Sequence, residues 1–409
     1  MALPKRTVVY GGAVLDDAEV RAVEKVLRSG LQVGANVAEF ERRCAALLGK
    51  RYGAMVNSGS SALMIAMRLL DLPPGSEVIT STLTFSTDVS SIVHAGYVPV
   101  FADCDADTYQ IDFASLERCV GPKTKALLVP NLIGGIPDWD RLRELADRHG
   151  LVLVEDSCDT LGASFRGAPP GTRADLSLTS FSLYHIITAM GNGGMVCTDD
   201  ARVWDRALTL RGWGRSSEPY LFGTRQAEND GRFEETLDGV DYDGLFIFRE
   251  LGYGFVPSEA GAAFGLAQLE KLPALSARRA ALFDRHLEFF RKHEDVFIAP
   301  RVLDGVTTTW ICFPVQLRGT QLRAQTVGTR KALQVHLEDR GIATRMIFSG
   351  NVTRQPMLRG VAFRADPLGC PNADRIMANG VMLPCHPTMT DEDCAYLYEA
   401  LDDFVALHR

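Results

Sequence analysis

The chain has 409 residues, of which 46% are hydrophobic and 23% are charged, and its formal net charge is −8. This length and composition predict a globular protein with a large core and two domains, and the negative charge argues against a nucleic-acid backbone or an anionic membrane as a partner. We expect a cytoplasmic protein, because no stretch reaches the roughly 20 apolar residues of a transmembrane helix and the N-terminus has no apolar signal core.

A candidate phosphate site follows the first predicted strand. The expected elements are helices over residues 15–28 and 37–48, a strand over 52–56 and a helix over 62–70. Between the strand and the last helix lie Ser58, Gly59, Ser60 and Ser61. Backbone N–H groups and hydroxyls at a helix N-terminus suit a phosphate, so Gly59 and Ser60 are candidates for binding one. An ordinary strand-to-helix turn has a similar composition and is the alternative interpretation.

Short apolar runs then alternate with helices. We expect strands over residues 77–80, 98–102, 126–130 and 151–154, with a helix over residues 139–149. The alternation predicts an α/β protein with a mostly parallel, doubly wound sheet. Such sheets bind ligands at the carboxyl ends of their strands. Gly59, Phe85, Asp156 and Ser180 each follow a predicted strand, so we expect them to converge at that edge.

The stretch over residues 180–194 organises the rest of the chain. An alternating run over residues 174–179 precedes it, and a strand resumes at residue 195. Within it, Ser180 stands five residues before His185, and Gly-Asn-Gly-Gly follows at residues 191–194. An imidazole titrates near neutral pH and can move a proton, so His185 is a candidate acid or base, with a structural histidine as the alternative. Asp156 ends a buried strand, where a helix cap is the alternative to a ligand contact.

The second half of the chain predicts a separate, smaller domain. The expected elements are helices over residues 202–211, 258–272, 277–293, 331–340 and 391–407, and a strand over 309–315. Ser276 is the candidate N-cap of the helix that begins at residue 277. The polar stretch over residues 216–243 is expected to be a long loop. We expect a large α/β domain over residues 1–275 and a smaller C-terminal domain over residues 276–409.

The nine cysteines are scattered along the chain, and no C-x-x-C pair occurs. In the cytosol such residues are expected to be reduced, partly buried thiols. The spacings of structural zinc and iron–sulfur sites are missing, so we expect no metal site.

Several motifs together resemble one enzyme family. They are the Ser-Gly-Ser-Ser turn, the acidic run over residues 155–162, the Ser-Phe-x-x-x-His motif, and the segments over residues 211–215, 251–253 and 344–356. The chain resembles the DegT/StrS-type aminotransferases, which are fold-type I enzymes dependent on pyridoxal phosphate. Within them it is similar to the histidine-containing sugar-nucleotide 3-dehydratases. Where the aminotransferases have their cofactor-binding lysine, this chain has His185, and residues 126–270 contain no lysine.

The resemblance implies a role for each candidate residue. Asp156 would pair with the pyridine nitrogen and keep the cofactor ring an electron sink. Phe85 would stack on the ring, although packing in the core is the usual fate of a phenylalanine. The implied cofactor contacts are Gly59, Ser60, Phe85, Asp156, Asp159 and Ser180. The implied base is His185, and the implied contacts of the sugar nucleotide are Arg345, Asn351 and Arg354.

The implied activity is C3 dehydration of a 4-keto-6-deoxy sugar nucleotide by non-covalently bound pyridoxamine or pyridoxal 5′-phosphate. L-Glutamate is the candidate amine donor, and a homodimer with composite active sites is expected. An iron–sulfur cluster is not expected, because residues 213–270 contain no cysteine to match the cluster ligands of CDP-sugar enzymes. The alternatives are a sugar-nucleotide aminotransferase and a catalytically inactive family member that still binds the cofactor.

Overall fold

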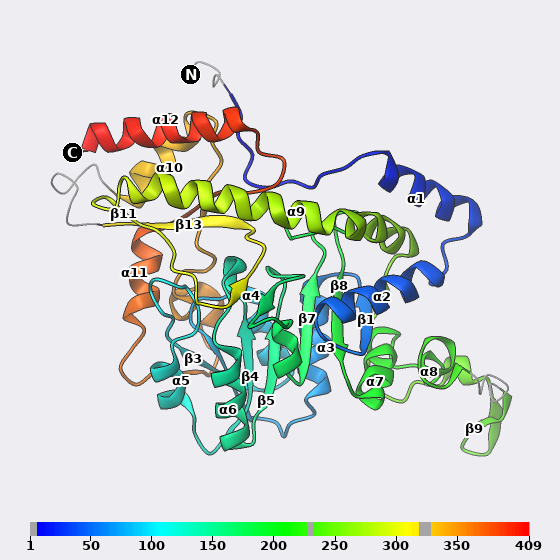
Figure 1. Ribbon diagram of the computed structural model, residues 1–409. Helices are drawn as coiled ribbons and strands as arrows, with labels where there is room; N and C mark the ends of the chain where they lie inside the picture. The colour runs from blue at the N-terminus through cyan, green and yellow to red at the C-terminus, as the bar shows by residue number, and fades with distance from the viewer. Residues whose placement is uncertain (1–5, 227–232, 319–328, 409) are drawn as a thin grey trace.

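The computed structural model describes residues 6–226, 233–318 and 329–408, and an eight-stranded sheet forms its centre (Figure 1). In spatial order the strands are β1 (Tyr52–Val56), β8 (Gly194–Thr198), β7 (Leu176–Ser180), β5 (Val152–Asp156), β4 (Thr124–Pro130), β2 (Glu77–Ser81), β3 (Val98–Ala102) and β15 (Arg364–Ala365). Strand β8 is antiparallel to β1 and β7, and the other neighbours are parallel. The expected mostly parallel α/β sheet is confirmed.

Helices cover both faces of this sheet because its apolar side chains alternate between the faces. The covering helices include α3 (Gly59–Leu69), α5 (Phe113–Cys119), α6 (Trp139–His149) and α7 (Ala201–Arg211). In β4, Ala126 and Leu128 belong to the core shared with α3 and α7. Leu127 and Val129 belong to the core shared with α5 and α6. Residues two apart lie on the same side of a strand, so the sequence of β4 places one helix layer on each face.

A smaller antiparallel sheet lies toward the C-terminus of the chain. Its spatial order is β11 (Phe297–Ile298), β13 (Cys312–Leu317), β16 (Gly380–Pro384) and β14 (Arg345–Met346). The further elements are α1 (Asp17–Ser29), α2 (Ala35–Leu47), α4 (Ser86–His94), α9 (Glu259–Arg291), α10 (Arg330–Glu338), α11 (Pro371–Asn379), α12 (Asp391–His408), and the paired strands β6 (Ser164–Phe165) and β12 (Val306–Thr307). Phe290 of α9, Phe313 of β13 and Phe404 of α12 are buried in one core, which joins this sheet to the two helices.

The long helix α9 corrects the prediction of two helices separated near residue 275. It runs for 33 residues and crosses above the central sheet in Figure 1. Its N-cap is Ser258, whose side chain accepts a hydrogen bond from the backbone of Gly261, so the prediction of Ser276 as a cap was wrong. Pro273 removes one helical hydrogen bond, but Leu272 and Leu275 on either side of it are buried in the core. The boundary expected between residues 275 and 276 falls inside α9, and the two-domain division stays a prediction.

The stretch over residues 216–243 is not simply a loop, although residues 227–232 lie outside the described residues. It contains α8 (Glu218–Phe222) and a hairpin of β9 (Glu235–Leu237) and β10 (Val240–Tyr242). The hairpin turns at Asp238 and Gly239, which have φ angles of 50° and 82°. Asp-Gly readily adopts two consecutive positive φ values, so this turn was a readable signal of the hairpin.

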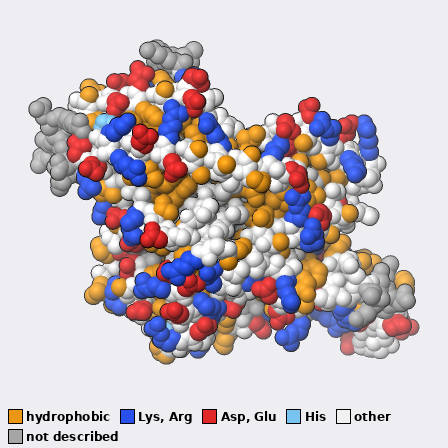
Figure 2. All heavy atoms as spheres, viewed as in Figure 1, with side chains coloured by type: hydrophobic (Ala, Val, Ile, Leu, Met, Phe, Trp, Pro, Cys, Tyr) orange, Lys and Arg blue, Asp and Glu red, His pale blue; other side chains and the backbone are white. Residues whose placement is uncertain are grey.

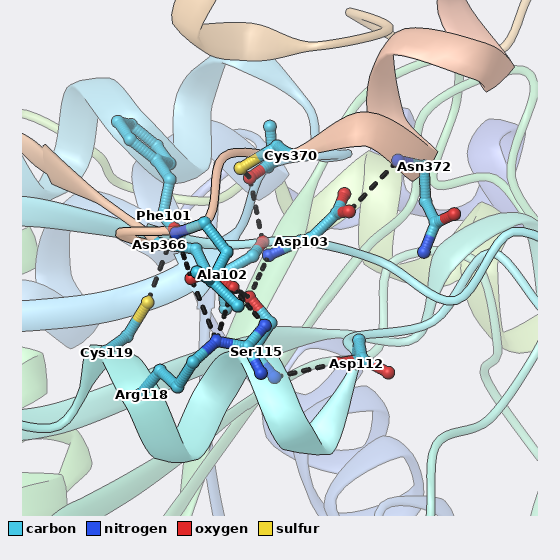
Figure 3. Close-up of polar contacts among 12 residues, drawn as sticks. Phe101, Ala102, Asp103, Asp112, Ser115, Arg118, Cys119, Asp366, Cys370 and Asn372 are labelled. Atoms are coloured by element: carbon cyan, nitrogen blue, oxygen red, sulfur yellow. Dashed lines mark hydrogen bonds and ion pairs between the residues drawn. The ribbon is translucent and has the colours of Figure 1, made fainter.

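Polar contacts join the segment after β15 to α5 and the start of α11 to the end of β3 (Figure 3). Asp366, which follows β15, accepts hydrogen bonds from the Ser115 hydroxyl at 2.5 Å and from Arg118 Nη2 at 2.5 Å. Asp103, which follows β3, accepts from two backbone N–H groups at the start of α11, each at 3.0 Å. A carboxylate at a helix N-terminus is favoured by the helix dipole. These contacts therefore fix the late part of the chain against the sheet edge.

Acidic and basic side chains are interspersed over the face of the molecule that Figure 2 shows. Hydrophobic side chains gather in the middle of this face, below α9. Within the described parts of the chain, every helix is too short or too polar to cross a lipid bilayer.

We predict that Asp366→Asn lowers the free energy of unfolding by about 1–3 kcal/mol at neutral pH, because hydrogen bonds between charged groups are lost. Arg118 holds the pKa of Asp366 at about 2, below its value of about 3.9 in an unfolded chain. A lowered pKa stabilises the fold above the unfolded value, and this contribution disappears as the pH falls through the folded value. Urea denaturation at several pH values should therefore show that the difference in free energy of unfolding between the wild type and Asp366→Asn narrows below about pH 4.

The control variant is Glu39→Gln, which removes the carboxylate of an exposed pair with Arg42. Exposed pairs contribute little, so this variant should unfold like the wild type. Equal stability of wild type and Asp366→Asn at neutral pH would contradict the assigned role of Asp366.

Candidate active site

A cavity of about 760 Å³ lies at the carboxyl ends of the central strands. Residues from the N-terminal segment, from the start of α3, from the segment after β7 and from the segment after β14 contribute to its wall. The predicted site residues that line it are Gly59, Ser60, Phe85, Asp156, Asp159, Ser180, His185 and Arg345. Gly59, Phe85, Asp156 and Ser180 therefore do converge at this edge of the sheet, as expected.

One end of the cavity is built from the start of α3 and the end of β7. Ser58 caps α3 by accepting a hydrogen bond from the backbone of Ser61 at 3.1 Å. A Cβ atom at Gly59 would lie 2.6 Å from Ser180 Cβ, closer than such atoms approach, so only glycine fits there. The positive N-terminus of α3 therefore meets the hydroxyls of Ser60 and Ser180, and this end suits a phosphate group.

Asp156 is the last residue of β5 and is buried at the cavity wall. One of its carboxylate oxygens accepts a hydrogen bond from the backbone of Cys158 at 2.9 Å. It caps no helix, so that alternative does not hold. Burial raises the pKa of Asp156 to about 6, so it is mainly a carboxylate at neutral pH and can accept a hydrogen bond from a ligand in the cavity.

Phe85 directly precedes α4 and is 54% exposed. Its ring lies edge-on to Phe348, with 6.3 Å between the ring centroids. Packing in the core, the alternative interpretation of Phe85, does not hold. The ring instead forms an apolar part of the cavity wall.

His185 lies beside Asp159, with 3.8 Å between His185 Nε2 and Asp159 Oδ1. Burial lowers the pKa of His185 to about 4, so its imidazole is neutral near pH 7 and can accept a proton. The other oxygen of Asp159 accepts a hydrogen bond from the backbone of Ile133 at 2.8 Å. Ile133 has a φ angle of 68°, an unfavourable conformation for a β-branched residue, which the surrounding structure enforces at this site.

A buried arginine contacts the backbone of the segment that carries His185. Arg279 of α9 donates to the carbonyl of Trp310 at 2.8 Å and to the carbonyl of His185 at 3.3 Å. The long helix therefore holds the backbone of His185 while the side chain lies at the cavity.

Of the three residues expected to contact a sugar nucleotide, one lies at the cavity wall and two lie away from it. Arg345 lies at the cavity wall, with its guanidinium 5.1 Å from the ring centre of Tyr10. Asn351 and Arg354 are not in the wall as the described residues form it. Both donate to Asp374 of α11, Asn351 at 2.7 Å and Arg354 at 2.5 Å. They therefore hold the segment after β14, which contributes residues to the cavity wall, against α11.

Tyr10 and Asp88 are among the cavity residues that the sequence analysis did not indicate. Tyr10 reaches the site from the N-terminal segment, which no local motif indicated. Asp88 is fully buried in the first turn of α4 and also lines the cavity. Its position three residues after Phe85, just after a strand end, was a signal that could have found it.

The chain matches the model of the DegT/DnrJ/EryC1/StrS aminotransferase family over residues 14–402. It is 34% identical over 413 residues to a dTDP-4-dehydro-2,6-dideoxy-D-glucose 3-dehydratase from Saccharopolyspora spinosa, covering 97% of this chain and 86% of that protein.

Two solved structures are similar along nearly the whole chain. A GDP-4-keto-6-deoxymannose-3-dehydratase with bound GDP-perosamine has a TM-score of 0.85 and 26% identity, with 97% of this chain and 100% of the other covered. The Escherichia coli GDP-4-keto-6-deoxy-D-mannose-3-dehydratase with bound hydrated PLP has a TM-score of 0.84 and 27% identity, with the same coverage.

We predict that the His185 imidazole stays neutral while the pH is lowered from about 8 to about 5, because burial opposes its charged form. Nuclear magnetic resonance of protein with isotope-labelled histidine should show no titration of His185 in this range. The His185→Asn variant identifies the signal. A titration midpoint near the ordinary histidine value of about 6.5 would contradict the prediction.

Proposed function

This chain belongs to the DegT/DnrJ/EryC1/StrS aminotransferase family, and from that premise we propose that it removes the C3 hydroxyl of a 4-keto-6-deoxy sugar nucleotide. Its cofactor is pyridoxamine or pyridoxal 5′-phosphate, held in the cavity without a covalent bond. When bound, the cofactor supplies an amine for the substrate ketone and a ring that accepts electrons.

The residues of the cavity fit this cofactor in shape and in chemistry. The start of α3, with Ser60 and Ser180, would hold the phosphate group. Asp156, a buried carboxyl group at the wall, would accept a hydrogen bond from the protonated pyridine nitrogen and keep the proton on the ring. Phe85 offers an exposed aromatic face on which the ring can stack.

The observation that carries the proposal is the histidine at the cavity wall. The described cavity wall contains His185 and no lysine, and an imidazole cannot form the covalent link that a lysine amine makes with the cofactor aldehyde. A neutral imidazole can instead take a proton from carbon and return it to oxygen. We therefore assign His185 as the base that moves a proton so that hydroxide can leave from C3. Asp159 is the acidic side chain beside this imidazole, at 3.8 Å, which is beyond hydrogen-bond distance.

The substrate assignment rests on charge. A sugar nucleotide is anionic, while this protein carries a net charge of −8, so a local cation is needed to bind it. Arg345 is the only lysine or arginine among the described residues of the cavity wall. We propose that its guanidinium binds the diphosphate, because arginine binds phosphate oxygens through two parallel hydrogen bonds.

The proposal also includes a homodimer. Exposed apolar side chains cluster in sequence near α8 and the β9–β10 hairpin, where Trp213 is 48%, Phe246 57%, Phe248 59% and Leu251 89% exposed. Large exposed apolar side chains gathered on one segment indicate an interaction surface. A second copy of the chain is the occupant we propose.

The central prediction compares His185→Asn with His185→Lys. With pyridoxamine phosphate, L-glutamate and 4-keto-6-deoxy sugar nucleotides, His185→Asn should retain the cofactor but form C3-deoxy product about 10²–10⁴-fold more slowly, because a positioned base is lost. His185→Lys should bind pyridoxal phosphate covalently and form a C4-amino sugar. Mass spectrometry of the sugar, per folded and cofactor-loaded protein, distinguishes the two products.

The matched control is His149→Asn, an exposed histidine at the end of α6, which should leave turnover unchanged. Wild-type turnover in His185→Asn would refute the assignment of the base. A C4-amino sugar formed by the wild-type protein would favour the aminotransferase alternative.

The dimer prediction concerns Leu251. Leu251→Asp places a charge in the proposed interface and should convert the dimer to a monomer of reduced activity in light-scattering and turnover measurements. Leu407→Asp changes another exposed leucine, near the end of α12, and should leave the dimer intact. A wild-type protein that is monomeric and fully active would rule out the composite site.

A further inference from the structure

Asp88 is a buried carboxyl group that the proposed function has not yet used. Its side chain is fully buried in the first turn of α4, and Thr84 Oγ1 donates to its Oδ2 oxygen. Its Oδ1 oxygen has no hydrogen-bond donor among the described residues. The Asp88 side chain interacts with the carboxyl group of Asp156. Both residues line the same cavity.

Two adjacent carboxyl groups in a buried site cannot both be ionised without strong repulsion, and they bond to each other only if one carries a proton. Burial and the neighbouring Asp156 raise the pKa of Asp88 well above its ordinary value. Burial raises the pKa of Asp156 to about 6, while donors from Cys158 and Asp88 act to lower it. The other ionisable groups near the pair are Cys158 and Asp159. Asp88 is therefore the member that holds the shared proton at neutral pH.

We propose that Asp88 is a positioning residue that donates this proton to Asp156 and so holds Asp156 as a carboxylate facing the pyridine nitrogen of the cofactor. The proposal rests on the proposed cofactor site and adds to it a second carboxyl group behind Asp156. The O–H donor fixes the orientation of the Asp156 carboxylate in a part of the cavity wall that already has a backbone donor from Cys158.

The consequence concerns where the proton of the pyridine nitrogen lies. A buried carboxylate with a raised proton affinity competes with the ring nitrogen for that proton. A hydrogen bond to the carboxylate lowers its proton affinity, so the proton stays on the ring. An ionised Asp88 would have the opposite effect, because its charge would raise the proton affinity of Asp156.

Two substitutions separate the donor from the charge. Asp88→Asn keeps a donor toward Asp156 at every pH, and its amide oxygen can still accept from Thr84. Asp88→Ala removes the donor. Ser91→Ala is the matched control, because it removes a buried hydroxyl from the same helix that donates to the Asp88 backbone and is not part of the cavity wall.

The first measurement is the protonation of the ring nitrogen in bound, isotope-labelled pyridoxamine phosphate, followed by magnetic resonance as the pH is raised. Wild type, Asp88→Asn and Ser91→Ala should keep the nitrogen protonated alike. Asp88→Ala should lose that proton more easily, with an equilibrium changed about ten- to hundred-fold, as expected for one hydrogen bond to a charged group. Identical behaviour of Asp88→Ala and wild type overturns the proposal, as does Asp88→Asn behaving like Asp88→Ala.

The second measurement needs neither cofactor nor substrate. Infrared difference spectra of the cofactor-free proteins at neutral pH should show a protonated-carboxyl band in wild type that Asp88→Asn lacks and Ser91→Ala retains. This comparison decides the question if Asp88→Ala does not fold. A wild-type spectrum without the band overturns the proposal. Both measurements are independent of C3-deoxy product, so failure of the dehydratase assignment would leave their outcome unaffected.

Discussion

The close approach of α3 to β7 and β8 is the constraint on which the site depends. Two glycines permit it: a Cβ atom at Gly59 would collide with Ser180, and a Cβ atom at Gly194 would lie 2.3 Å from the carbonyl oxygen of Ser58. With both present, the helix N-terminus lies directly against the ends of the strands. That contact places a positive helix end, two hydroxyls and the strand-end acids around one cavity.

The charges of the cavity divide it into regions of different chemistry. Asp88, Asp156 and Asp159 gather on the side of the central strands, where burial raises the pKa of each carboxyl group. His185 is neutral for the same physical reason, since burial disfavours any charged form. Arg345 provides positive charge from β14, a strand of the small C-terminal sheet. Among the described wall residues, a carboxylate near the ring, a neutral base and one arginine together suit a cationic ring and an anionic substrate.

The sheet and most of the site were predictable from local patterns, because short apolar runs, strand-end acids and the Gly-Ser turn are signals within a few residues. Asp156 and His185 could be located in this way. Tyr10 could not, since it reaches the cavity only through long-range packing of the N-terminal segment beside β14. Asn351 and Arg354 illustrate the same limit, because both bond with Asp374 of α11, a partner that no sequence spacing indicates. The continuity of α9 was missed because Pro273 usually ends a helix, whereas here buried neighbours support it.

In the function that we propose, the protein breaks the bond between C3 and its oxygen. The most direct measurement uses a 4-keto-6-deoxy sugar nucleotide that carries an oxygen isotope at C3, incubated with the wild-type protein, pyridoxamine phosphate and L-glutamate. We expect the isotope to appear in water and the sugar product to have lost one oxygen while its C4 carbonyl remains. A sugar that retains the labelled oxygen and gains an amine at C4 would contradict the proposed function.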